Sequence, residues 1–158
     1  MLRVVAYVGD NRARFKELLK VFATEDYRLC QRAAWPLMHI ADKEPALIKP
    51  HLTFLVNLLQ KPMHDAVKRN VLRILQDTEI PEKLSGRVTD YCFSYMRSLT
   101  EPIAVRVFAM TILANMCSTY PELKQELIPL IEDMLPYGSA GMKNRGSKLL
   151  VKLRRLPG

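Results

Sequence analysis

Glycine, cysteine and tryptophan are scarce in this chain of 158 residues, which contains six, three and one of them respectively. So few glycines argue against a β-rich fold, because such folds need many tight turns. Cys30, Cys92 and Cys117 are odd in number and widely spaced, and no Cys-x-x-Cys pair occurs. This pattern indicates neither a disulfide framework nor a zinc site, and we predict reduced thiols in a cytoplasmic protein.

Long apolar runs are also missing. No stretch of the sequence reaches the length that spans a bilayer, so we predict no membrane span. Residues 1–10 contain one arginine and a short apolar stretch, but no cleavage site of small residues follows them. This argues against a secretory signal.

Recognisable catalytic motifs are few. The three histidines, His39, His51 and His64, do not have metal-ligand spacing, and no phosphate-binding loop, dinucleotide fingerprint or nucleophile elbow occurs. We therefore predict no catalytic residue, no metal and no cofactor. Gly138, Ser139 and Met142 match part of the G-S-x-x-M-x-x-K-x-N signature of the fumarase and argininosuccinate lyase superfamily. Arginine and serine replace its lysine and asparagine, so we interpret the stretch as a helix start with Ser139 as N-cap.

A repeat runs through the chain instead. Four segments share the plan of an apolar-periodic helix, a short turn and a second helix, at approximately residues 10–43, 47–80, 84–119 and 122–156. One arginine recurs in each second helix, at spacings of 37, 37 and 39 residues: Arg32, Arg69, Arg106 and Arg145. Prolines lie at the joints, where they end helices or occupy first turns.

The apolar residues follow a helical period, as in the stripe formed by Phe15, Leu18, Leu19 and Phe22. A single hairpin of two such helices cannot bury its apolar face alone, whereas stacked hairpins bury a continuous core. The pattern predicts an all-α fold, a right-handed α–α superhelix (α-solenoid) of about four helical hairpins. We expect residues 1–158 to form one such domain, and leave open whether residues 1–8 are a remnant half-repeat or a disordered leader.

The repeat resembles the HEAT-repeat family over almost the whole chain. That family places a polar capping residue six positions before the recurring arginine, and Asp26, Thr100 and Ser139 stand at this spacing, whereas the second repeat has Met63 there. The resemblance implies that the arginine bridges to an acidic side chain or to carbonyls of a neighbouring repeat. The alternative is a basic ladder that binds phosphates.

The net charge of +8 is unevenly distributed. No acidic residue follows Asp133, while six basic residues do: Lys143, Arg145, Lys148, Lys152, Arg154 and Arg155. They form an amphipathic basic helix, which could contact nucleic acid, an acidic protein or anionic lipid. The other interpretation, which we favour, is a polar cap that ends the solenoid.

Trp35 is the only tryptophan. The HEAT-like alkylpurine DNA glycosylases, which this chain resembles more weakly, present a tryptophan with an aspartate one helical turn on. Here His39 stands one turn after Trp35, and Asp42 two turns after it. We therefore interpret Trp35 as a core anchor between the first two repeats, although His39 could face a ligand beside it.

These observations favour a non-enzymatic scaffold that binds a protein or peptide on the concave face formed by the second helices. The alternative is a nucleic-acid-binding HEAT-like protein related to DNA alkylation repair. Neither the partner nor the oligomeric state follows from the sequence. The candidate partner-binding residues are Arg28, Arg32, Trp35, His39, Lys68, Arg69, Arg73, Arg106, Arg145, Lys148 and Lys152.

Overall fold

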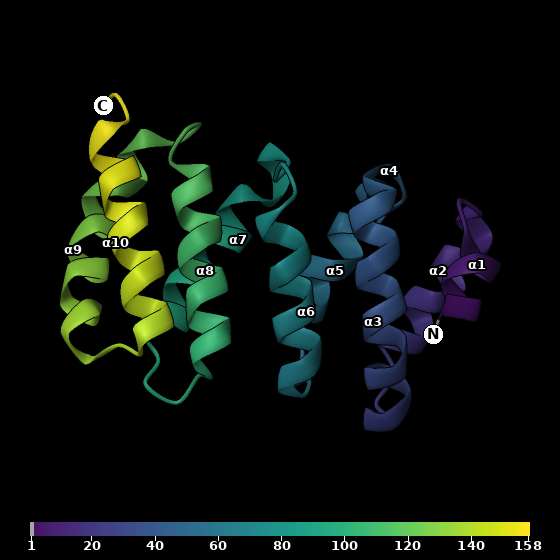
Figure 1. Cartoon of the computed structure of the whole chain (residues 1–158). Helices are drawn as coiled ribbons and strands as arrows, with labels where there is room; N and C mark the ends of the chain where they lie inside the picture. Colours follow the sequence, from purple (N-terminus) through teal and green to yellow (C-terminus); the bar gives the residue numbers. More distant parts are fainter. Residues whose placement is uncertain (1) are drawn as a thin grey trace. The chain divides into compact units, whose positions relative to one another are not determined.

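The computed structural model describes residues 2–158, which form helices, turns and loops and contain no strand (Figure 1). The predicted all-α, HEAT-like solenoid class is therefore confirmed. Contacts between Cα atoms divide the chain into two compact units, Met1–Thr78 and Glu79–Gly158. Two of the four expected repeats fall in each unit. The single domain over residues 1–158, with its repeat limits, stays a prediction.

The first unit consists of two helical hairpins preceded by a short helix. That helix, α1 (Leu2–Val8), contacts α2 and α3, so the segment before the first repeat is helical from Leu2 onward. The remaining elements are α2 (Arg12–Phe22), α3 (Tyr27–Lys43), α4 (Pro45–Ile48), the 3-10 turn Lys49–His51, α5 (Leu52–Leu58) and α6 (Asp65–Gln76).

Local chemistry explains where the helices of the first unit begin. The Asp26 carboxylate accepts hydrogen bonds from the backbone amides of Arg28 and Leu29, at 2.9 and 3.2 Å, and so caps α3. Asn11 caps α2 in the same way through the amide of Arg14. The predicted stripe at Phe15, Leu18, Leu19 and Phe22 is buried.

The second unit also consists of two hairpins, which contain α7 (Glu82–Arg97), α8 (Ile103–Met116), α9 (Lys124–Met134) and α10 (Ala140–Arg155). Short 3-10 turns, Pro121–Leu123 and Leu135–Tyr137, flank α9. Ser139 caps α10, because its hydroxyl accepts a hydrogen bond from the amide of Met142 at 3.2 Å. Its expected counterpart Thr100 is not a cap: α8 begins after Pro102, and the Thr100 hydroxyl bonds instead to that of Ser98.

A buried lysine joins α9 to the end of α10 in the second unit. Lys124 is only 7% exposed, and its ammonium group donates hydrogen bonds to the carbonyls of Leu156 and Pro157, at 2.7 and 3.1 Å. Positive charge at a helix C-terminus also complements the helix dipole. Lys124, on α9, thereby holds the end of α10 in place.

No helix within residues 2–158 is long and apolar enough to cross a membrane.

Candidate functional site

A groove in the first unit lies between the second helices of its two hairpins, α3 and α6. Its volume is about 330 Å³. We call it the α3/α6 groove. It is lined by Gln31, Ala34, Trp35, Met38, His39 and Asp42 from α3 and by Ala66, Arg69, Asn70 and Arg73 from α6. Four of the candidate residues named from the sequence are therefore brought together here: Trp35, His39, Arg69 and Arg73.

Trp35 is not the core anchor that the sequence suggested. Its side chain is 44% exposed. It stacks on His39, one turn further along α3, with ring centroids 5.0 Å apart and planes 12° apart. Met38, which lines the same groove, is buried. The indole therefore offers one aromatic surface to the groove.

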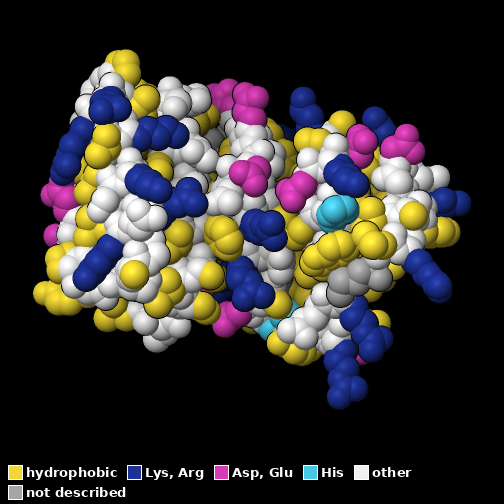
Figure 2. All heavy atoms as spheres, viewed as in Figure 1, with side chains coloured by type: hydrophobic (Ala, Val, Ile, Leu, Met, Phe, Trp, Pro, Cys, Tyr) yellow, Lys and Arg dark blue, Asp and Glu magenta, His cyan; other side chains and the backbone are white. Residues whose placement is uncertain are grey.

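Arg69 and Arg73 form the opposite wall. Both are exposed, and they stand one helical turn apart on α6. Neither side chain makes a hydrogen bond or ion pair within residues 2–158. Between them, the Asn70 amide donates to the carbonyl of Ala66 at 2.7 Å, which fixes its orientation. In Figure 2, a histidine and hydrophobic side chains over α3 border Lys and Arg side chains over α6.

The N-terminal ends of the two helices meet at a second aromatic contact. Tyr27, the first residue of α3, contacts His64, the residue before α6, with centroids 4.9 Å apart and planes at 71°. The Gln31 amide donates to the Tyr27 hydroxyl. Since both helices begin at this contact, α3 and α6 run in the same direction along the groove.

Sequence reasoning missed two polar groups of the groove, Gln31 and Asn70, and did not weigh Asp42 as a partner-binding residue. A usable signal existed for Gln31, which stands one turn before Trp35 on the same helix face. The candidates Arg28 and Arg32 are exposed on α3 but do not line the groove, and Lys68 is half-buried on α6.

The four recurring arginines differ in what they contact. The half-buried Arg106 guanidinium donates from Nε and Nη2 to the carbonyl of Met96, at 3.3 and 3.1 Å, and so joins α8 to α7. This is a bridging role, although the carbonyl belongs to its own repeat rather than a neighbouring one. Arg32, Arg69 and Arg145 are exposed and make no such bond within residues 2–158.

All six basic residues of α10 are exposed, and Figure 2 shows Lys and Arg side chains along this helix. Arg145, Lys148, Lys152 and Arg155 share one side of it. Lys152 donates to the Asn115 side chain at 3.4 Å, and Arg154 forms an ion pair with Glu132. Arg145 and Lys148 are exposed and have no such partner within the described part of the chain. The neighbouring helix α8 has Arg106 as its only charged residue, so the basic surface of α10 does not continue onto α8.

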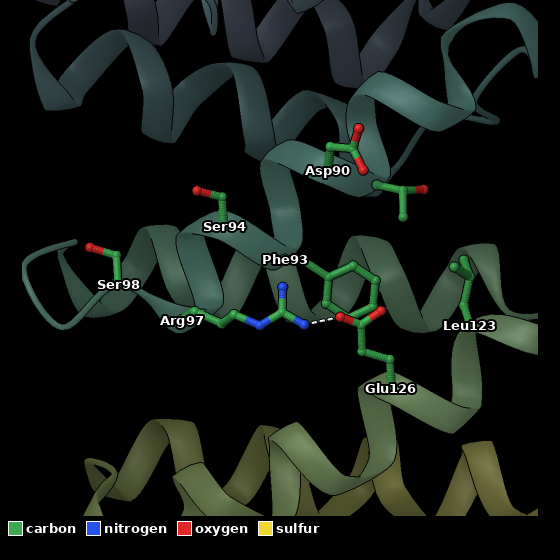
Figure 3. A pocket seen from close by; sticks show the side chains of 8 residues that line it. Asp90, Phe93, Ser94, Arg97, Ser98, Leu123 and Glu126 are labelled. Atoms are coloured by element: carbon green, nitrogen blue, oxygen red, sulfur yellow. Dashed lines mark hydrogen bonds and ion pairs between the residues drawn. The ribbon is translucent and has the colours of Figure 1, made fainter.

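A larger groove in the second unit, of about 510 Å³, lies between α7 and α9 (Figure 3). Arg97 and Glu126 point toward each other there and form an ion pair. The Arg97 guanidinium also lies over the Phe93 ring, 5.2 Å from its centroid. The remaining lining of this groove is polar except for Leu123, and comprises Thr89, Asp90, Ser94, Ser98 and Leu123. We call it the α7/α9 groove.

Neither groove contains a reactive thiol. Cys30, Cys92 and Cys117 are free and buried. Burial raises the pKa of all three thiols, that of Cys117 to about 11, so they are protonated at neutral pH. Residues 2–158 also contain no group of three His, Cys, Asp or Glu side chains that could hold a metal ion.

Comparison with known proteins identifies the family to which the chain belongs. Searches of curated proteins and of solved structures found no match. The weaker resemblance to alkylpurine DNA glycosylases therefore has no support from them. The family model of the HEAT repeat domain, in contrast, matches residues 1–153. The chain belongs to the HEAT repeat family, whose members are generally non-enzymatic repeat scaffolds.

Proposed function

We propose that this protein is a non-enzymatic scaffold that binds a short segment of a partner protein in the α3/α6 groove. One observation carries the proposal: the exposed Trp35, stacked on His39, shares a groove with two arginines that have no partner within residues 2–158. Tryptophan and arginine are the residue types that most often dominate the energetics of protein interfaces.

The groove suits a peptide better than a small substrate. It is an open trough between two parallel helices, and its polar groups come from side chains spread along both. Second helices of α-solenoids commonly form such binding surfaces. The groove lining contains no serine, threonine, cysteine or lysine that could act as a nucleophile.

Intrinsic fluorescence provides a direct test, because Trp35 is the only tryptophan in the chain. Short random peptides displayed on phage are selected against the protein, and synthetic copies are titrated while Trp35 emission is followed. We expect a saturable change in emission. With fluorescein-labelled copies of the same peptides, Trp35→Ala should weaken binding by about tenfold or more, measured by anisotropy.

The matched control is Arg97→Ala, which alters the α7/α9 groove and should leave peptide affinity unchanged. Circular dichroism checks that both variants fold. Equal binding by the wild type and Trp35→Ala, or a failure to select any peptide, would show that the α3/α6 groove is not a peptide site.

A second candidate function, nucleic-acid binding, is favoured by the exposed basic side of α10. Such binding would depend steeply on salt, because it rests on release of counterions from phosphates. Gel shifts at low salt with single-stranded and duplex DNA test it. Binding that disappears in Lys148→Glu/Lys152→Glu would favour this candidate, and the absence of any shift would exclude it.

A further inference from the structure

We infer that the α3/α6 groove selects a peptide segment of about five residues that carries an aspartate or glutamate beside a bulky apolar side chain. The inference rests on the proposed function and specifies its ligand. It combines the charge of one wall, the aromatic surface of the other and the single acid at one end of the groove.

The charge of the α6 wall points to a carboxylate. Arg69 and Arg73 are like charges one turn apart, an arrangement that destabilises a helix when nothing neutralises it. Asp65 and Asp77 stand one turn outside this pair, yet neither is in ion-pair contact with it within residues 2–158. A bound carboxylate relieves the repulsion, and guanidinium groups bind carboxylates in a planar, bidentate geometry.

The α3 wall points to an apolar neighbour for that carboxylate. Stacking on His39 orients the indole of Trp35, so its exposed face loses little freedom when a ligand covers it. Met38 and Ala66 are buried beneath this part of the groove and give it an apolar floor. An aromatic, proline or long aliphatic side chain therefore buries apolar surface on both the indole and the floor.

The length of the bound segment follows from the part of α3 that lines the groove. Gln31 and Asp42 mark its two ends. Their separation along the helix corresponds to about 16 Å at the helical rise per residue. An extended peptide covers this distance with about five residues.

Asp42 favours a peptide over a polynucleotide. It places a carboxylate in a groove whose other charges are Arg69 and Arg73. A nucleic-acid strand presents phosphates at regular intervals and needs several neutralising contacts along its length. It would therefore bring a phosphate toward Asp42, whereas a peptide can place one acid on the arginines and a neutral or basic residue at Asp42.

A specificity switch tests the inference. Short random peptides on phage are selected in parallel against the wild type, Arg69→Glu/Arg73→Glu and the control Arg28→Glu/Arg32→Glu. The control reverses the same number of exposed arginines on α3, outside the groove lining. We expect acidic–apolar peptides from the wild type and the control, and basic–apolar peptides from Arg69→Glu/Arg73→Glu. Wild-type peptides should bind that variant about tenfold or more weakly, by anisotropy.

The outcomes separate the inference from the function on which it rests. Peptides that need Trp35 but show no acidic preference, or that bind Arg69→Glu/Arg73→Glu equally well, would overturn the inference and leave the proposed function standing. Peptides that do not need Trp35 would overturn both. The inference would also be overturned, in favour of a polynucleotide, if labelled single-stranded DNA bound the wild type more tightly than any selected peptide and did not bind Trp35→Ala.

Discussion

The arginines of the α3/α6 groove differ from three cations of the second unit, which are bonded within that unit. In Glu79–Gly158, Lys124 bonds to backbone carbonyls near the C-terminus, Arg106 joins α8 to α7, and Arg97 pairs with Glu126. In the α3/α6 groove of Met1–Thr78, Arg69 and Arg73 have no partner within residues 2–158.

The difference shows that a repeated residue need not have a repeated role. Arg69 and Arg106 occupy the same place in successive repeats, yet one is exposed beside a groove and the other bonds to a carbonyl of its own hairpin. A cation already bonded within its unit must break that bond before it can bind a partner. Unpaired cations keep their donors available.

The largest effect on stability is expected at Lys124. Lys124→Met retains most of the aliphatic stem but removes the two hydrogen bonds to Leu156 and Pro157, and hydrogen bonds from charged groups contribute about 1.5–3 kcal/mol. We expect a loss of this order in the free energy of urea unfolding. Lys152→Met, with one 3.4 Å contact from an exposed side chain, should change it by less than about 0.5 kcal/mol. Equal losses would contradict the closing role of Lys124.

Two glycines of α10 differ in how closely the rest of the second unit packs against them. A Cβ on Gly146 would come within 2.6 Å of the Leu135 Cδ2 atom, so the glycine allows α10 to pack closely. A Cβ on Gly141 would meet nothing. Gly141→Ala should raise the free energy of unfolding by about 0.5–1 kcal/mol, because alanine has the higher helix propensity. Gly146→Ala should be less stable than Gly141→Ala by about 1–3 kcal/mol, because of overpacking. Equal stabilities in urea would contradict the tight contact.

The recurring arginines allow the comparison to be tested at equivalent positions. Arg106→Met removes the two hydrogen bonds that the half-buried Arg106 guanidinium donates to the carbonyl of the buried Met96, and should lower the free energy of urea unfolding by about 1–2 kcal/mol. Arg69→Met removes an exposed guanidinium without a bond and should change stability by less than about 0.5 kcal/mol. A similar cost for both variants would mean that both arginines are structural, and would remove Arg69 from the proposed binding site.

How far the sequence predicts the structure can be seen at particular residues. The buried stripe at Phe15 to Phe22 and the caps at Asp26 and Ser139 follow from local rules of periodicity and hydrogen bonding, so they were predictable. The role of Trp35 was not, because its exposure depends on which face of α3 the hairpin partner covers. Likewise, Gly146 weakens a helix in isolation, and only its contact with Leu135 shows why a larger residue fits poorly.

The smallest effect is expected for the ion pair between Arg97 and Glu126. Both side chains are about half exposed, at 51% and 52%, so a double-mutant cycle with alanine should give a coupling of only about 0.2–1 kcal/mol. The coupling should fall as salt is raised. The same cycle on Lys20 and Glu17, an exposed ion pair within one turn of α2, gives a reference value for the coupling. A coupling near zero would mean that Arg97 is as available to a partner as Arg69 and Arg73, and the contrast between the two grooves would then rest on Trp35 alone.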